Sequence, residues 1–335
     1  MKNSETHDKA LASRMQRRDF MRVVGTFALG AAVAEIPSHA DAIPAESGTR
    51  ESIFEKTASI GLGVKNPSAI TACADGRIFV AGEDVIVGLT RDGKEIVRHS
   101  VNGRPDSIIA DSDGKLMLGM RDHVAVLSPD GSSTELWSRL GDHAYITSMA
   151  ADEHSVFIAD AGNRVVLRFD RSGSLLNRIG ERDRERDIPG LVVPSPYFDV
   201  ALDPMGALWV VNPGKHGLES YRPDGSLITS WYRPGMDLTG FCGCCNPIHI
   251  AFLGNSSLVT VEKGLNRVKV LAPDLTIRGL VTGPRSAEGL SVDLACTEKP
   301  PIKGLAVDSK DRILVLDGQN SCILVFEEES AVIKA

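Results

Sequence analysis

The sequence predicts an all-β chain folded as one six-bladed β-propeller. Three observations predict this fold: a strand–turn pattern that repeats six times, abundant glycine, and a spare strand ahead of the first repeat. In each repeat, short apolar runs rich in β-branched residues are separated by polar turns, several of which contain Asp-Gly. The chain has 32 glycines in 335 residues, and apolar stripes of helical period are scarce after residue 45. Since a single blade cannot bury both of its faces, we expect the copies to stack around an axis.

The repeats follow one another along the chain with a spacing of about 40 residues early and about 50 later, which is typical of propeller blades. In the first copy, apolar runs at 67–72, 77–80 and 85–89 alternate with Asp-Gly turns at 75–76 and 92–93. The later copies carry the same pattern over 105–131, 156–173, 207–225, 258–270 and 305–326.

The last copy lacks an outer strand, because it stops after its third apolar run at 322–326. The segment 53–62 precedes the first copy and has no other partner in the pattern. We expect it to pair with the last copy, which would close the ring and remove an unpaired edge.

Two turns of the chain carry similar sequences, Asp-Ala-Gly-Asn-Arg-Val at 160–165 and Lys-Gly-Leu-Asn-Arg-Val at 263–268. These stretches resemble NHL repeats, and the resemblance covers nearly all of residues 53–327. It implies an NHL-like six-bladed propeller. It implies no single activity, because this architecture hosts lactonases, lyases, receptors and scaffolds.

Residues 1–42 are typical of a cleavable signal peptide. Arg17-Arg18-Asp19-Phe20-Met21 looks like a twin-arginine signal, and an apolar run at 23–34 is followed by small residues up to Ala42. This run is too short for a stable membrane anchor. We therefore expect a periplasmic or otherwise exported protein whose mature domain, residues 43–335, is the propeller. Because the twin-arginine route carries folded proteins, it permits a cofactor.

The charge of the chain bears on its partners. The net charge is −7, and no basic run lies outside the leader, so nucleic-acid binding has little electrostatic support. We expect the partner to be another exported protein or a redox protein.

The most informative local feature is a cluster of three cysteines, Cys242, Cys244 and Cys245, in the stretch Gly-Phe-Cys-Gly-Cys-Cys-Asn-Pro at 240–247. The blade pattern places it in the connection from the outer strand of blade four to the inner strand of blade five, at one mouth of the channel. Cys296 lies in the equivalent connection of the next blade. This stretch resembles a subgroup of exported NHL-type propellers, which implies family membership and no particular chemistry.

Three interpretations of these four cysteines stay open. Four thiolates predict a metal centre, an iron–sulfur cluster or copper or zinc, although the C-x-C-C spacing differs from that of ferredoxins and zinc fingers. Disulfides are favoured by an oxidising compartment, and reduced thiols would serve redox or thiol-transfer chemistry. The other two cysteines, Cys73 and Cys322, are expected to be structural.

Four polar residues are further candidates for the channel. His249 begins the inner strand of blade five, where it could bind a metal, line the channel or bond to the backbone. Asp160, Asn212 and Glu262 occupy equivalent positions after second strands, and six-bladed lactonases hold calcium through such groups. Asp in this position also caps turns in plain NHL repeats.

The sequence thus predicts an exported propeller that binds a metal centre through Cys242, Cys244, Cys245 and Cys296 for redox or accessory work. One alternative is a binding propeller that is braced by disulfides and has no cofactor. The other is a hydrolase or lyase that uses a metal in the channel. The sequence leaves open whether the protein is an enzyme.

Overall fold

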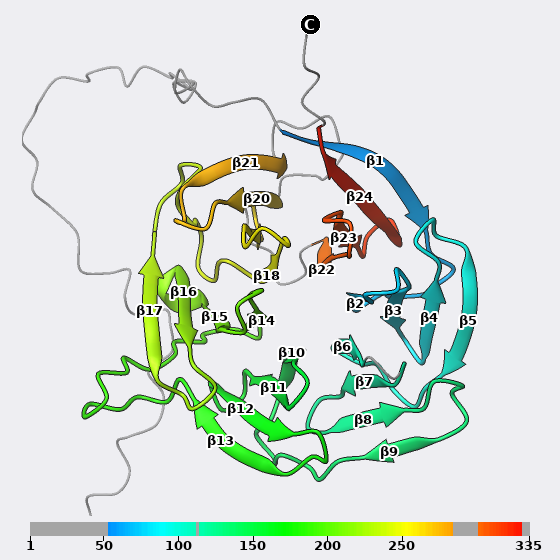
Figure 1. Ribbon diagram of the computed structural model, residues 1–335, viewed down its shortest axis with the longest axis horizontal. Helices are drawn as coiled ribbons and strands as arrows, with labels where there is room; N and C mark the ends of the chain where they lie inside the picture. Colours follow the sequence, from blue (N-terminus) through cyan, green and yellow to red (C-terminus); the bar gives the residue numbers. More distant parts are fainter. Residues whose placement is uncertain (1–52, 112–113, 284–300, 330–335) are drawn as a thin grey trace, which may run out of the picture. The chain divides into compact units, whose positions relative to one another are not determined.

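The computed structural model describes residues 53–111, 114–283 and 301–329, which form six four-stranded antiparallel sheets around a central axis (Figure 1). The predicted six-bladed β-propeller is confirmed. The predicted signal peptide and Cys296 lie outside the described residues.

Each sheet is one blade, and in blades one to five the strands run outward in chain order. Their bounds are β2 (Ala69–Ala72), β3 (Ile78–Gly82), β4 (Val85–Leu89) and β5 (Glu95–Ser100); β6 (Ser107–Ala110), β7 (Leu116–Gly119), β8 (Val124–Leu127) and β9 (Thr134–Leu136); β10 (Ile146–Ala151), β11 (Ser155–Asp160), β12 (Val165–Asp170) and β13 (Leu175–Ile179); β14 (Val200–Leu202), β15 (Leu208–Asn212), β16 (Gly217–Tyr221) and β17 (Leu227–Tyr232); β18 (His249–Phe252), β19 (Leu258–Glu262), β20 (Arg267–Leu271) and β21 (Ile277–Thr282).

Blade six is closed by the start of the propeller domain. It combines β22 (Ile302–Val307), β23 (Ile313–Asp317) and β24 (Cys322–Glu328) with β1 (Phe54–Gly61), which pairs antiparallel with β24. The prediction that segment 53–62 supplies the missing outer strand is confirmed. This pairing gives the exposed side of β24 a hydrogen-bonded partner.

The core lies between neighbouring blades. The second strands are almost fully buried, as in β19, where every residue is buried. Val259 and Val261 of β19 pack in one cluster with Ile313 and Val315 of β23, so blades five and six share apolar surface. The outer strands face solvent, as shown by Leu136 of β9, which is 63% exposed. Burial of both faces of each sheet is the main source of stability in this arrangement.

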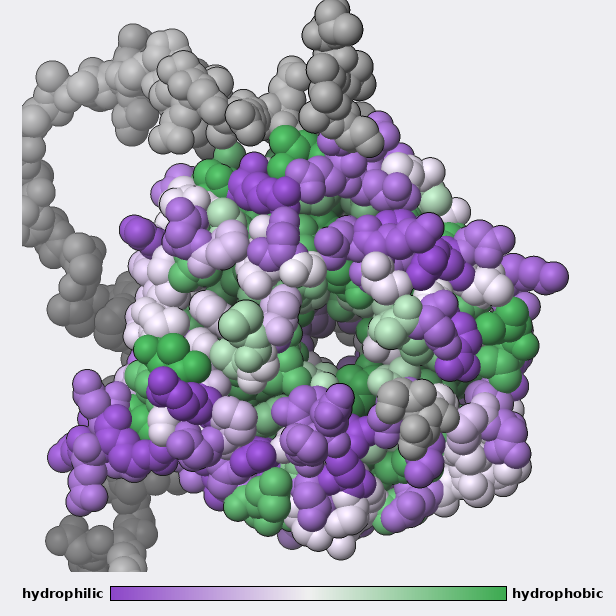
Figure 2. Space-filling model, viewed as in Figure 1, coloured by the Kyte–Doolittle hydropathy of each residue, from purple (hydrophilic) through white to green (hydrophobic). Residues whose placement is uncertain are grey.

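The inner strands of the six blades surround a central channel, whose opening is visible in Figure 2. Residues of β2, β6, β10, β14, β18 and β22 line a cavity of about 210 Å³ inside it. Helical structure in the described part of the chain amounts to a 3₁₀ turn at Pro213–Lys215, and none of the helices described there is long and apolar enough to cross a bilayer.

Candidate thiol site and channel mouth

The cysteine loop, residues 240–247, connects blade four to blade five beside the turn between β19 and β20. The side chain of Asn246 fixes this position: its Nδ2 donates to the carbonyl oxygen of Lys263 (3.1 Å), and its Oδ1 accepts from the Lys263 N–H (2.9 Å). Asn246 Nδ2 also donates to the carbonyl oxygen of Cys242, which closes the loop on itself. Gly243 has a φ of 79°, in the left-handed region that favours glycine, and so allows the tight turn between Cys242 and Cys244.

The three cysteines of the loop differ in exposure. Cys244 is exposed, Cys242 is half-buried, and Cys245 is buried with 3% of its surface exposed. No disulfide joins any two of the cysteines that the structure describes. Within the described ranges there is also no group of three or more His, Cys, Asp or Glu side chains placed to hold a metal ion.

The two cysteines predicted to be structural have suppressed acidity. Burial raises the pKa of Cys73 to about 11, and burial also raises the pKa of Cys322. A raised pKa lowers the thiolate fraction at neutral pH and makes these thiols poor nucleophiles and poor metal ligands.

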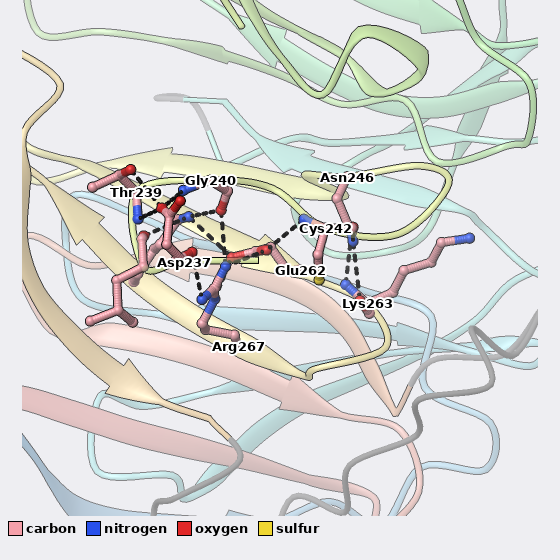
Figure 3. A network of polar contacts seen from close by, with 10 residues as sticks. Asp237, Thr239, Gly240, Cys242, Asn246, Glu262, Lys263 and Arg267 are labelled. Atoms are coloured by element: carbon pink, nitrogen blue, oxygen red, sulfur yellow. Dashed lines mark hydrogen bonds and ion pairs between the residues drawn. The ribbon is translucent and has the colours of Figure 1, made fainter. Parts of the chain in front are cut away.

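A buried charged triad, Glu262, Arg267 and Lys269, lies next to the cysteine loop. Figure 3 shows two of its members, Glu262 and Arg267, close to Cys242. Arg267 binds the Glu262 carboxylate with two hydrogen bonds, Nε to Oε1 at 2.7 Å and Nη2 to Oε2 at 2.8 Å. The Nζ of Lys269 lies 3.2 Å from Glu262 Oε1. Exposure of each of the three side chains is at most 5%, so their charges are removed from water and depend on one another.

The two cations of the triad hold the backbone of the loop and of the residues just before it. Arg267 donates to the carbonyl oxygens of Asp237 (3.0 Å) and Gly240 (2.9 Å). Lys269 Nζ donates to the carbonyl oxygens of Leu238 (3.0 Å) and Gly240 (2.6 Å) and lies 4.2 Å from the centre of the Phe241 ring. These contacts fix the backbone that leads into Cys242.

Glu262 also reaches the cysteine loop directly, because the Cys242 N–H donates to its Oε2 at 3.5 Å. Burial lowers the pKa of Lys269 to about 8, while the Glu262 carboxylate acts in the opposite direction. The triad therefore contains a lysine that can lose its proton near the upper end of the physiological pH range.

Of the four predicted channel residues, His249 lines the channel cavity. Asp160, Asn212 and Glu262 end second strands and are fully buried, one strand outward from the cavity. Asp160 accepts from the Tyr145 and Asn163 N–H groups at 2.9 and 3.2 Å. The structure does not bring these four residues together around one point.

Asn212 belongs to a different polar group, in blade four. Its Oδ1 accepts from the Val192 N–H (3.0 Å), and its Nδ2 donates to Glu219 (2.8 Å), a buried carboxylate that also accepts from the hydroxyls of Tyr221 and Tyr232. Burial and the nearby Glu219 carboxylate raise the pKa of both tyrosines. These contacts use the polar atoms of Asn212 within the blade.

A residue that sequence reasoning missed lies next to His249. Asp199, which directly precedes β14, has its Oδ2 3.3 Å from His249 Nδ1. The two residues are 50 positions apart and belong to neighbouring blades, so no local sequence motif predicts their contact. The only signal in the sequence is that both stand where an inner strand begins.

Comparisons with known proteins support the fold alone. No protein-family model and no curated protein matches the chain. Among solved structures, the chain is similar to virginiamycin B lyase from Staphylococcus aureus, with 12% identity and a TM-score of 0.55 over 82% of this chain and 99% of that one. It is similar to the WD40 β-propeller domain of Doa1, with 12% identity and a TM-score of 0.56 over 85% and 100%. It is also similar to hydrazine synthase of Kuenenia stuttgartiensis, with 12% identity and a TM-score of 0.53 over 79% and 96%.

Proposed function

We propose that this protein is an exported propeller whose cysteine loop binds a soft metal centre and serves redox or accessory work with a protein partner. The observation that carries the proposal is the buried charged triad. Burying three charges is costly, and here the cations donate to the backbone carbonyls of residues 237, 238 and 240. Such an arrangement stabilises one conformation of a loop that offers three thiols, as a preorganised ligand set requires.

The exposures of the sulfur ligands suggest distinct roles. Cys244 is accessible from solvent and Cys242 is half-buried, so this pair on either side of Gly243 would meet an incoming ion first. Cys245, with its buried side chain, and Cys296 of the next blade would complete the coordination after a small adjustment of the loop. Thiolates select soft ions, and copper(I) suits a site that begins with two sulfurs, whereas an iron–sulfur cluster needs all four.

The location of the protein belongs to the same proposal. The twin-arginine motif at 17–21 supports export of the folded and loaded protein to the periplasm. The partner would then be another exported protein, which exchanges electrons or metal with the exposed Cys244 side of the loop.

The test is anaerobic purification of the full chain, followed by metal analysis and an absorption spectrum. We expect stoichiometric copper, or iron with a broad thiolate-to-iron band, and we expect Cys244→Ser to lose it. Cys73→Ser is the matched control and should keep the metal. Absence of metal, with the loop cysteines blocked to thiol reagents until reduction, would refute the proposal and favour a binding propeller braced by disulfides.

A further inference from the structure

Two of the loop cysteines stand one residue apart and both reach the surface. Cys244 is exposed and Cys242 is half-buried, whereas Cys245 is buried. Neither of the first two belongs to a disulfide, so the pair is in the dithiol state. Since the sulfur of Cys244 is accessible from outside, an external sulfur compound can reach it. This pair can therefore do chemistry that needs no metal.

Chain geometry selects Cys242 and Cys244 as the thiols that can be joined. An unstrained disulfide needs Cα atoms about 4.4–6.8 Å apart. Neighbouring residues are about 3.8 Å apart across a trans peptide, so Cys244 and Cys245 are too close for such a bond. Residues two apart are separated by at most about 7 Å in an extended chain, and a turn shortens this separation. The chain bends at residues 243–245, with a φ of 79° at Gly243, which favours a bond between Cys242 and Cys244.

The backbone of Cys242 is held at both of its polar groups (Figure 3). Its N–H donates to Glu262 Oε2 at 3.5 Å, and its carbonyl oxygen accepts from Asn246 Nδ2. Both partners are fully buried, so they attach Cys242 to the interior of the molecule. Cys244 lies at the exposed side of the same turn. The residue that carries the inner thiol is therefore fixed before a compound reacts at Cys244.

We propose that Cys242 and Cys244 are a redox-active dithiol that exchanges with disulfides. This activity goes beyond the proposed metal binding and uses the same two thiols when no metal is bound. The substrate class is an accessible disulfide, carried by a small compound or by a protein. Cys244 is the attacking thiol because it is exposed, and Cys242 is the thiol that resolves the mixed disulfide.

The exchange has two steps in which atoms and electrons balance. In the first, the Cys244 thiolate attacks one sulfur of the substrate, the S–S bond of the substrate breaks, and its other sulfur leaves as a thiolate. In the second, the Cys242 thiolate attacks the Cys244 sulfur, closes the Cys242–Cys244 bond and releases the remaining thiolate. The leaving thiolates take up the protons that the two cysteines lose. The pair is oxidised and the substrate disulfide is reduced, and the reverse exchange with a dithiol restores the pair.

The test uses the reduced, metal-free full chain and mass spectrometry after an acid quench. Oxidised glutathione and insulin serve as separate probes, which distinguishes a small disulfide from one in a protein. With glutathione, we expect wild type to form a disulfide within residues 240–247 and to keep no adduct. Cys242→Ser should stop after the first step and keep one glutathione on Cys244. Cys244→Ser should react about tenfold more slowly or less, since the accessible thiol is gone.

Three further variants test the assignment of the pair. Cys245→Ser and Cys73→Ser each remove a thiol outside the pair and should react as wild type does. Gly243→Ala keeps every thiol and should prolong the mixed disulfide, because a φ of 79° is strained for alanine and the turn opens. The proposal is overturned if neither probe is reduced, if Cys245→Ser abolishes the internal disulfide, or if Cys244→Ser reacts as fast as wild type.

The exchange test and the metal test can fail independently. Exchange is measured on protein stripped of metal, and metal content is measured on protein purified without oxidation. Loss of the exchange activity with metal retained would overturn the dithiol and leave the metal centre. Exchange without any bound metal would support the dithiol and refute the metal centre.

Discussion

Blades three and five carry an acidic residue at the same place and use it differently. Asp160 and Glu262 each end a second strand, pair with the first residue of the third strand, and precede a turn of four residues. Asp160 caps its own turn, with its Oδ2 accepting from Asn163 Nδ2 at 2.7 Å. Asp317 in blade six repeats this with Asn320, also at 2.7 Å. Glu262 instead binds Arg267 and Lys269 and reaches Cys242.

Three differences in sequence explain this change of role. Leu265 stands where Asn163 stands, so blade five has no amide side chain at the position that caps the turn in blade three. Arg267 stands where Val165 stands and supplies a charged donor across the turn. Glu is one methylene longer than Asp and can reach the neighbouring connection. The same strand-end position therefore caps a turn in blade three and supports the cysteine loop in blade five.

The largest effect is expected from Glu262→Ala. The substitution leaves Arg267 and Lys269 buried without a counter-charge, and breaking a buried pair in this way costs about 4 kcal/mol of unfolding free energy. Urea denaturation measures the loss. A loss below about 1 kcal/mol, as is typical of an exposed pair, would show that the triad is open to water and not the support described here.

A smaller effect is expected from the titration of Lys269. Its pKa is about 8 in the folded protein, against an ordinary value of 10.5, so between these values the unfolded chain binds more protons. The unfolding free energy contributed by this group should therefore rise with pH across that window, by at most ~3 kcal/mol. The measurement is the difference between wild type and Lys269→Met, because other groups titrate in both. A difference that does not vary over the window would contradict the shift.

Asn246→Ala tests the attachment of the cysteine loop without touching a charge. It removes the three hydrogen bonds to Cys242 and Lys263 and should cost about 2 kcal/mol. Hydrogen exchange should become faster at the Lys263 amide and in the loop, and remain unchanged in blade three. Equal exchange in wild type and variant would mean that the Asn246 side chain does not hold the loop.

The smallest effect is expected from Asp160→Ala in blade three. Its turn loses a local cap with bonds to Tyr145 and Asn163, which is worth about 1 kcal/mol. Alkylation rates of Cys242 and Cys244, followed by mass spectrometry, should not change, whereas Glu262→Ala should change both. Altered alkylation rates in Asp160→Ala would contradict the claim that Glu262, and not Asp160, supports the cysteine loop.

The fold followed from the sequence because apolar runs and Asp-Gly turns recur along the chain, and segment 53–62 had one place left to pair. The cluster of Cys242, Cys244 and Cys245 could also be recognised in the sequence. The roles of Asp160, Asn212 and Glu262 could not be predicted from the sequence. All three end the second strand of a blade, and their contacts depend on side-chain length and on neighbours such as Leu265. The pair of Asp199 and His249 was hidden because it joins different blades.

The most direct test of the account is the copper(I) affinity of the reduced full chain, measured by competition with a chelator in wild type, Glu262→Gln and Asp160→Asn. We predict tight binding in wild type, a loss of about tenfold or more in Glu262→Gln, and no change in Asp160→Asn, because Glu262, unlike Asp160, contacts the loop whose thiols we propose as the ligands. Equal affinities in all three proteins, or no binding in any of them, would contradict the claim that the triad of blade five holds a metal-binding loop.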